Sequence, residues 1–211
     1  MRRWYLVRHA ETVWNQERRL QGGSDTPLSP LGVRQAACLR AYFASRPIRA
    51  IVSSHLQRSH QTARAIAEGN GHCLAPLIEP GLAEIHLGEW EGLTPEEVNA
   101  RYAEAYTQWK LAPSVTHVPG AEPVAAFLHR VRRARDDLLT TLEAEEAVIV
   151  THGGVIAALL ADALRADYNH LLQYLRLDNG GVSAVEFEAD QLAHVVWINR
   201  TSHLDGLSST P

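Results

Sequence analysis

Cysteine is scarce in this sequence: only Cys38 and Cys73 occur among the 211 residues. Two cysteines cannot form the disulfide framework of a small secreted domain, and both lie in apolar surroundings along the chain. We therefore expect two buried free thiols in a protein located in the reducing cytoplasm.

Long apolar runs are also missing, since no segment reaches the roughly 18 uninterrupted apolar residues that cross a bilayer. The basic N-terminus is followed by a short apolar run, residues 4–7, which ends at Arg8. This run is too short for a signal peptide. The sequence therefore predicts neither membrane association nor secretion.

An excess of positive charge is absent as well: 20 lysine and arginine residues face 24 aspartate and glutamate residues, for a net charge of −4. A nucleic-acid partner is therefore not expected, and a phosphate-bearing ligand would need a local basic pocket. The composition, 45% hydrophobic and 21% charged, is typical of a folded protein, and the length fits one domain.

Short apolar runs alternate with helical patterns along the chain, which is typical of an α/β fold. We predict a three-layer α/β/α architecture with a mostly parallel central sheet, in a single domain over residues 1–199. Residues 200–211, rich in Ser, Thr and Gly, should form a loosely held tail. The predicted strands cover residues 4–8, 50–53, 74–78, 147–151, 182–187 and 193–198. The predicted helices cover residues 30–45, 56–68, 95–109, 124–142 and 153–164.

Three predicted strands end in residues that could bind a ligand. The first strand ends at Arg8 and His9, and the second leads into residues 53–58, which include Arg58. The strand at 147–151 is followed by His152 and then by a glycine pair. In an open α/β sheet, ligands bind beyond the carboxyl ends of the strands. These segments should therefore meet in one crevice that holds two arginines and two histidines.

Arginine and histidine together suit a phosphoryl group. A guanidinium makes paired hydrogen bonds to phosphoryl oxygens, and a neutral imidazole can act as a nucleophile and form a phosphohistidine. The helix predicted to begin at Gly153 would add backbone N–H groups at its positive end. Taken alone, however, a histidine in the position of His9 is more often an ordinary polar residue at the end of a strand.

Five ordered blocks of sequence make the interpretation more specific. They are RHAET with the nearby Asn15, RLQG with DTPL and Gly32, SSHLQR with QTA, LAEI with GEWEG, and THGG. Together they resemble the motifs of the histidine phosphatase superfamily, the phosphoglycerate mutase-like fold. The blocks fall in the family's order between residues 8 and 154.

The resemblance implies a role for each matching residue. His9 would be the phosphorylated nucleophile, and Glu84 the proton donor to the leaving oxygen and then the base that activates water. His152 would be a third catalytic residue, which binds the phosphoryl group together with Arg8 and Arg58. No metal or cofactor is required, because positive charge and positioning stabilise the transferring group. The residues expected to bind the phosphate group are Arg8, Asn15, Gln21, Arg58 and Gly153.

Several residues depart from the family pattern or allow two interpretations. Ala10 replaces a glycine, Pro123 replaces a serine, and His55 replaces a proline. His55 and the nearby His60 could lie at the pocket rim, but a helix-start role or solvent exposure is the simpler interpretation. The other histidines lack metal-binding spacing, so no metal site is expected.

Aromatic and basic side chains outside the motifs are harder to interpret. Trp90, Tyr102 and Trp109 could line a substrate mouth or pack in the core. We interpret the arginines between positions 130 and 135 as a solvated helix face, with Arg130 able to reach a loop.

The family divides into hydrolases, which transfer the phosphoryl group to water, and mutases, which return it to a sugar acid. This chain lacks the insertion of the mutases, and its PGAE run at residues 119–122 resembles the PGGE run of the phosphatases. We therefore predict a histidine acid-type phosphatase: a metal-independent, cofactor-free phosphomonoesterase that acts on a small phosphorylated metabolite.

Two alternatives remain. One is a cofactor-dependent phosphoglycerate mutase. The other is a catalytically inactive binding module, which predicts the loss of at least one catalytic residue, although all are present. The physiological substrate and the formation of a homodimer stay open.

Overall fold

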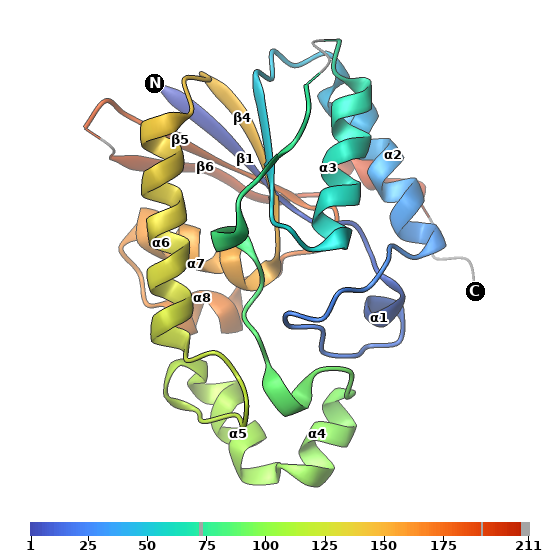
Figure 1. Ribbon diagram of the computed structural model, residues 1–211, viewed down its shortest axis with the longest axis vertical. Helices are drawn as coiled ribbons and strands as arrows, with labels where there is room; N and C mark the ends of the chain where they lie inside the picture. The colour runs from blue at the N-terminus through green and yellow to red at the C-terminus, as the bar shows by residue number, and fades with distance from the viewer. Residues whose placement is uncertain (72–73, 191, 208–211) are drawn as a thin grey trace.

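The computed structural model describes residues 1–71, 74–190 and 192–207, and a six-stranded sheet forms its centre (Figure 1). The strand order is β3-β2-β4-β1-β5-β6. β3, β2, β4 and β1 pair in parallel, whereas β5 pairs antiparallel with β1 and with β6. The strands are β1 (Arg2–Arg8), β2 (Ala50–Ser53), β3 (Leu77–Ile78), β4 (Glu146–Thr151), β5 (Val182–Phe187) and β6 (Ala193–Arg200).

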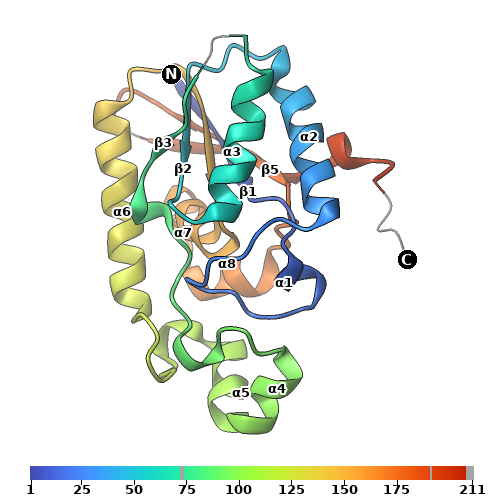
Figure 2. The same cartoon turned by 45° about the vertical axis from the view of Figure 1, so that its right-hand side comes forward.

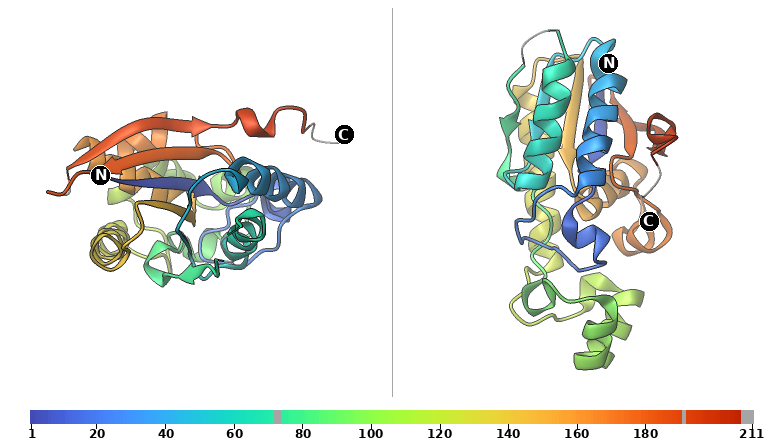
Figure 3. Two further views of the ribbon diagram at one scale, coloured as in Figure 1. Left: turned by 90° about the horizontal axis from the view of Figure 1, so that it is seen from above. Right: turned by 90° about the vertical axis from the view of Figure 1, so that its right-hand side faces the viewer.

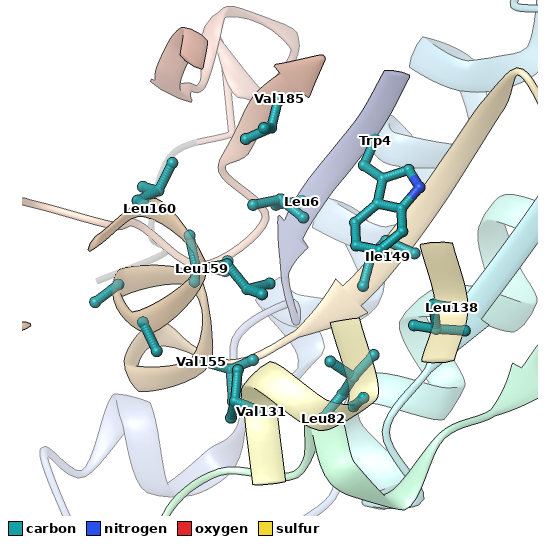
Figure 4. Close-up of a cluster of buried hydrophobic side chains, with 14 of the residues drawn as sticks. Trp4, Leu6, Leu82, Val131, Leu138, Ile149, Val155, Leu159, Leu160 and Val185 are labelled. Carbon is teal, nitrogen blue, oxygen red and sulfur yellow. The ribbon is translucent and has the colours of Figure 1, made fainter. Parts of the chain in front are cut away.

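Helices cover both faces of this sheet, and the alternation of side chains along β1 shows how. Trp4 and Leu6 join one apolar cluster with helices α6 (Val124–Thr141) and α7 (Gly153–Leu164), which Figure 4 shows in close-up. Tyr5 and Val7 join a second cluster with α2 (Pro30–Ala44) and α3 (Gln57–Gly69), which lie side by side in Figures 1 and 2. Successive side chains of a strand point to opposite faces, so one apolar run supplies two cores. The predicted three-layer α/β/α architecture is confirmed.

The prediction of one continuous helix over residues 95–109 is wrong, because the helix breaks at Tyr102. The segment forms α4 (Pro95–Arg101) and α5 (Ala103–Leu111), and Tyr102 between them has φ −135° and ψ 44°. The break allows Tyr102, Tyr106 and Trp109 all to pack around the buried Trp90. This local apolar cluster outweighs the continuous helical pattern, and the resulting lobe extends beyond the end of the sheet (Figure 3).

Two short helices were not predicted from the sequence. α1 (Val13–Gln16) is a single turn, closed by reciprocal hydrogen bonds between Thr12 and Asn15. α8 (Tyr168–Tyr174) is capped by the preceding Asp167, whose carboxylate accepts from the His170 N–H. Within the described ranges, no helix is long and apolar enough to cross a membrane.

Cys38 is half-buried rather than buried, because the core face of α2 is formed by Ala36, Leu39 and Phe43 and the thiol lies beside that face; Cys73 lies outside the described residues. In the region expected to be a loose tail, Ser202–Leu204 forms a 3₁₀ turn.

The register of the strands sets the position of the site. Arg8 at the end of β1 lies opposite Thr151 at the end of β4, and Ser53 at the end of β2 lies opposite Val150. Three strands therefore end at nearly the same level. The loops that follow them meet at this edge of the sheet, next to α1, α8 and the α4–α5 lobe (Figure 2).

Candidate active site

His9 follows β1 directly, and its side chain is almost completely buried. Its Nδ1 lies 2.8 Å from the backbone carbonyl oxygen of Ala10. A carbonyl can only accept, so Nδ1 carries the proton and Nε2 keeps a free lone pair. Burial, followed by the nearby Arg58 and Arg8 guanidinium groups, holds the pKa of His9 well below its ordinary value. The imidazole is therefore uncharged at neutral pH and can act as a nucleophile through Nε2.

His152 lies between β4 and α7, and its ring centroid is 5.1 Å from that of His9. Its Nε2 is 2.7 Å from the Ser54 hydroxyl, whereas its buried Nδ1 has no hydrogen-bond partner within the described part of the chain. Burial and the positive charge of Arg58 lower the pKa of His152. A Ser54 hydroxyl that donates to Nε2 leaves the proton on Nδ1, which can then donate to a ligand.

Two arginines supply positive charge without a carboxylate partner. Arg58 is 1% exposed, and its Nη1 and Nη2 donate to the carbonyl oxygens of Ser24 and Gly22 at 2.6 and 2.8 Å. Arg8 donates from Nη1 to the Leu177 carbonyl oxygen at 2.5 Å. Neither arginine forms an ion pair with any residue described, and both Nε–H groups are buried without an acceptor. Burial lowers the pKa of Arg58 to about 10, so the guanidinium is still charged at neutral pH.

Asn15 and Gln21 have their amide oxygens already engaged. The Asn15 Oδ1 accepts from the Thr12 N–H at 3.1 Å and from Asn179 at 3.2 Å. The Gln21 Oε1 accepts from the hydroxyls of Thr12 and Thr26 at 2.8 and 2.6 Å. Each amide is thereby oriented with its NH₂ group left to donate into the cavity that both residues line.

Glu84 is fixed by the first turn of α7. Its Oε2 accepts from the Gly154 N–H, and its Oε1 accepts from the Ile85 N–H, both at 3.0 Å. A Cβ atom at position 154 would lie 2.4 Å from the Glu84 Oε1, so glycine is needed for this approach. Gly153, at the N-terminus of α7, lies next to the Arg8 Nε. The positive end of the helix therefore faces the same space as the two arginines.

Arg130 holds the segment before Glu84, as expected for an arginine able to reach a loop. Its Nη1 donates to the carbonyl oxygens of Gly81 and Ala83 at 2.9 and 2.7 Å, and its Nη2 donates to the Glu84 carbonyl oxygen at 3.0 Å. Its Nε and Nη2 also pair with the Glu122 carboxylate at 2.7 and 2.8 Å. Glu122 belongs to the PGAE run, and the sequence predicted no role for it. No local sequence pattern predicts the ion pair between Arg130 and Glu122.

One cavity of about 390 Å³ brings the predicted site together. Seven of the eight predicted site residues line it, and the eighth, His152, packs next to the His9 ring. Trp109 also lines the cavity, whereas Trp90 is fully buried and the Tyr102 hydroxyl donates to Glu89. His55 and His60 do not line it. The lining site residues are Arg8, His9, Asn15, Gln21, Arg58, Glu84 and Gly153.

This arrangement defines a class of site. A neutral histidine with a free Nε2 lines a pocket together with arginines, amide groups and a helix N-terminus that can all donate hydrogen bonds to an anion, and a carboxyl group lies beside them. These groups are suited to phosphoryl transfer through a phosphohistidine. Across the described residues, no group of histidine, cysteine or acidic side chains could hold a metal ion.

Comparison with known proteins agrees with this class. The family model of the histidine phosphatase superfamily (branch 1) matches residues 4–200. The chain belongs to this superfamily.

The proteins that the chain resembles include both a probable mutase and a phosphatase. A bifunctional protein of Mycobacterium tuberculosis is 36% identical over 96% of this chain, which spans 55% of that protein. The chain thus covers about half the length of the mycobacterial relatives it matches. A probable phosphoglycerate mutase of Yersinia pestis is 33% identical, over 95% of this chain and 94% of its own length.

Two solved structures share the fold closely. The Bacillus stearothermophilus protein YhfR has a TM-score of 0.89 and 30% identity, covering 97% of this chain and 100% of its own. The mycobacterial glucosyl-3-phosphoglycerate phosphatase, solved with VO₃, has a TM-score of 0.85 and 28% identity, covering 95% of this chain and 100% of its own.

Proposed function

We propose that this protein is a phosphomonoesterase that needs neither a metal ion nor an organic cofactor and works through a phosphohistidine. The observation that carries the proposal is the His9 imidazole, which is neutral, keeps Nε2 free and lines a cavity with two unpaired arginines. A nucleophile of this kind splits one difficult displacement into two easier ones.

In the first step, the His9 Nε2 attacks the phosphorus atom and the bond from phosphorus to the ester oxygen breaks. Glu84, as the carboxylic acid, donates its proton to the leaving oxygen, and the alcohol departs. The hydrogen bond from the His9 Nδ1 to the Ala10 carbonyl oxygen stays in place throughout and stabilises the ring as it gains charge.

In the second step, water attacks the phosphohistidine and gives one proton to the Glu84 carboxylate. The bond from nitrogen to phosphorus breaks, and inorganic phosphate and the acid form of Glu84 are restored. Arg8, Arg58 and the N-terminus of α7 stabilise the charge on the transferring group in both steps.

Hydrolysis rather than mutase activity is favoured by the charge around the cavity. A mutase must also hold the carboxylate of a sugar acid, which calls for a further cation. The third arginine that lines the cavity, Arg19, lies 2.7 Å from the Glu17 carboxylate and 3.4 Å from the Glu97 carboxylate. Its charge is therefore already balanced.

Incubation with 3-phosphoglycerate, with and without 2,3-bisphosphoglycerate, separates the two activities. We expect release of inorganic phosphate that does not depend on the bisphosphate and that continues in EDTA. Formation of 2-phosphoglycerate would identify a mutase instead. Strict dependence on a divalent ion would contradict the proposed mechanism.

A further inference from the structure

Beyond the phosphate-binding end, the cavity changes character and becomes apolar. Its wall there is formed by side chains from α8 and the residue that follows it, from the end of α5 and from the loop after Glu84. Six of them are Ile85, Leu87, Trp109, Leu171, Leu172 and Leu175. An apolar wall of this size beside a phosphate site is suited to an apolar part of a ligand.

No side chain described in this apolar half of the cavity carries an unpaired charge that could bind an ionic substrate. Among the described residues that line the cavity, Arg19 is the only charged side chain besides the phosphate-binding arginines and the proposed proton donor Glu84. It is occupied by the carboxylates of Glu17 and Glu97 and donates to the Gly92 carbonyl oxygen at 2.7 Å. Tyr168 adds a hydroxyl whose pKa is raised by burial, so it too is uncharged. A carboxylate placed here would lose its hydration without gaining a cation.

The apolar wall is held in place before any ligand binds. The Trp109 ring packs edge-on against Trp90, with centroids 5.9 Å apart, and stacks with Tyr106 at 6.4 Å. The Gln173 side chain of α8 donates to the Lys110 carbonyl oxygen at 2.9 Å and so ties α8 to α5. A preformed wall loses little conformational entropy on binding.

We propose that this apolar chamber is the subsite for the alcohol half of the substrate and selects monophosphate esters of uncharged alkyl or aryl alcohols. The proposal rests on the proposed phosphatase function, since it assigns the leaving group of the same site. The alcohol oxygen lies near Glu84, and the carbon skeleton extends along α8 toward Trp109.

A series of straight-chain alkyl phosphates from ethyl to hexyl tests the subsite. The leaving oxygens in this series differ little in reactivity, so differences report binding of the chain. We expect kcat/KM to rise roughly two- to fourfold with each methylene that the chamber buries. We also expect butyl phosphate to exceed 3-phosphoglycerate by more than about tenfold, since the latter places a carboxylate in the chamber.

Two variants assign the effect to the chamber. Leu172→Asn keeps the shape of the side chain but makes it polar, and we expect it to flatten the dependence of kcat/KM on chain length. Tyr174→Ser is the matched control, because Tyr174 lies on the same helix, is 80% exposed and does not line the cavity. We expect the control to keep the slope of the unaltered protein.

The outcomes separate this proposal from the proposed function. Phosphate release with a flat or falling dependence on chain length overturns the subsite and leaves the phosphatase in place. If no ester releases phosphate, the proposed function fails, and the His9→Ala variant still tests the subsite by calorimetric binding of the same alkyl phosphates. A dissociation constant that falls with chain length supports the proposed subsite. A dissociation constant that does not change with chain length overturns it.

Discussion

Arg130 on α6 donates a hydrogen bond of 3.0 Å to the backbone carbonyl oxygen of Glu84, which lies 46 positions earlier in the chain. The Glu84 carboxylate is fixed at its other end by the Gly154 N–H. The proposed proton donor is thus positioned through its backbone by one helix and through its side chain by another. Its place relative to His9 depends on both helices, and each can be altered separately.

Arg130→Lys keeps the positive charge but cannot reach all the partners of the guanidinium. We expect kcat/KM for hexyl phosphate to fall on the order of 10- to 100-fold, because small misplacements of a catalytic group are costly. For 2,4-dinitrophenyl phosphate, whose leaving group needs no protonation, we expect little change. Arg133→Lys on the same helix is the control, since the Arg133 side chain is 77% exposed. Equal losses on both esters would show a general structural defect rather than misplacement of Glu84.

Gly154→Ala disturbs the same carboxylate from the other side. The added Cβ would lie 2.4 Å from the Glu84 Oε1, so the side chain must move. We expect a loss of kcat of about tenfold or more on alkyl phosphates. Gly71→Ala is the matched control, because nothing lies within 4 Å of a Cβ at that position. Steady-state assays of the two variants make the comparison, and unchanged activity of Gly154→Ala would argue against Glu84 as the proton donor.

Replacement of the nucleophile should abolish turnover with little effect on folding. His9→Ala is expected to lower kcat by at least about 1,000-fold, since no second nucleophile is placed to replace Nε2. The unaltered protein should yield an acid-labile phosphohistidine after a short reaction with a labelled ester, and the variant should yield none. His55→Ala, at an exposed position outside the cavity, is expected to label normally. Labelling of His9→Ala would place the nucleophile elsewhere.

Stability should fall as the solution becomes more acidic. Burial and the neighbouring arginines hold the pKa values of His9 and His152 well below the ordinary value of 6.5, which both residues regain on unfolding. Below about pH 6.5 the unfolded chain binds protons that the folded chain does not, so the free energy of unfolding decreases. Each histidine contributes a slope of up to about 1.4 kcal/mol per pH unit, and neither contributes above about pH 7.

Urea unfolding between pH 5 and 8 measures this slope. The His9→Asn variant should show a shallower decrease between pH 6.5 and 5 than the unaltered protein, whereas His55→Asn should not. An unchanged slope in His9→Asn would mean that His9 is protonated in the folded state.

The sequence was most informative where a residue lies at the end of a buried strand. Arg8 and His152 follow apolar runs whose strand character is clear, and their meeting follows from the rule for parallel sheets. The contacts of Arg130 could be anticipated only as a reach toward some loop, because its partners lie at distant positions in the chain. Its pairing with Glu122 depends on how α6 packs beside the sheet, which no local pattern determines.

The less predictable parts of the site are those built by tertiary packing. α8 is a single short helix whose leucines face the cavity, and its helical pattern is too short to distinguish from a loop. The break at Tyr102 follows from the gathering of three aromatic rings around Trp90, which overrides a favourable helical sequence. The apolar chamber depends on both features, so the sequence indicated the phosphate site but not the alcohol side.

The level ends of β1 and β4, with Arg8 opposite Thr151, have a consequence for the assembly of the protein. The phosphate-binding groups come from chain segments more than a hundred residues apart, and pairing of these strands is what brings them together. Long-range pairing of this kind forms slowly, because a large loop must close first. A nascent or partly refolded chain that has not joined these strands therefore lacks the site. The time course over which enzymatic activity recovers during refolding reports when the central sheet is complete.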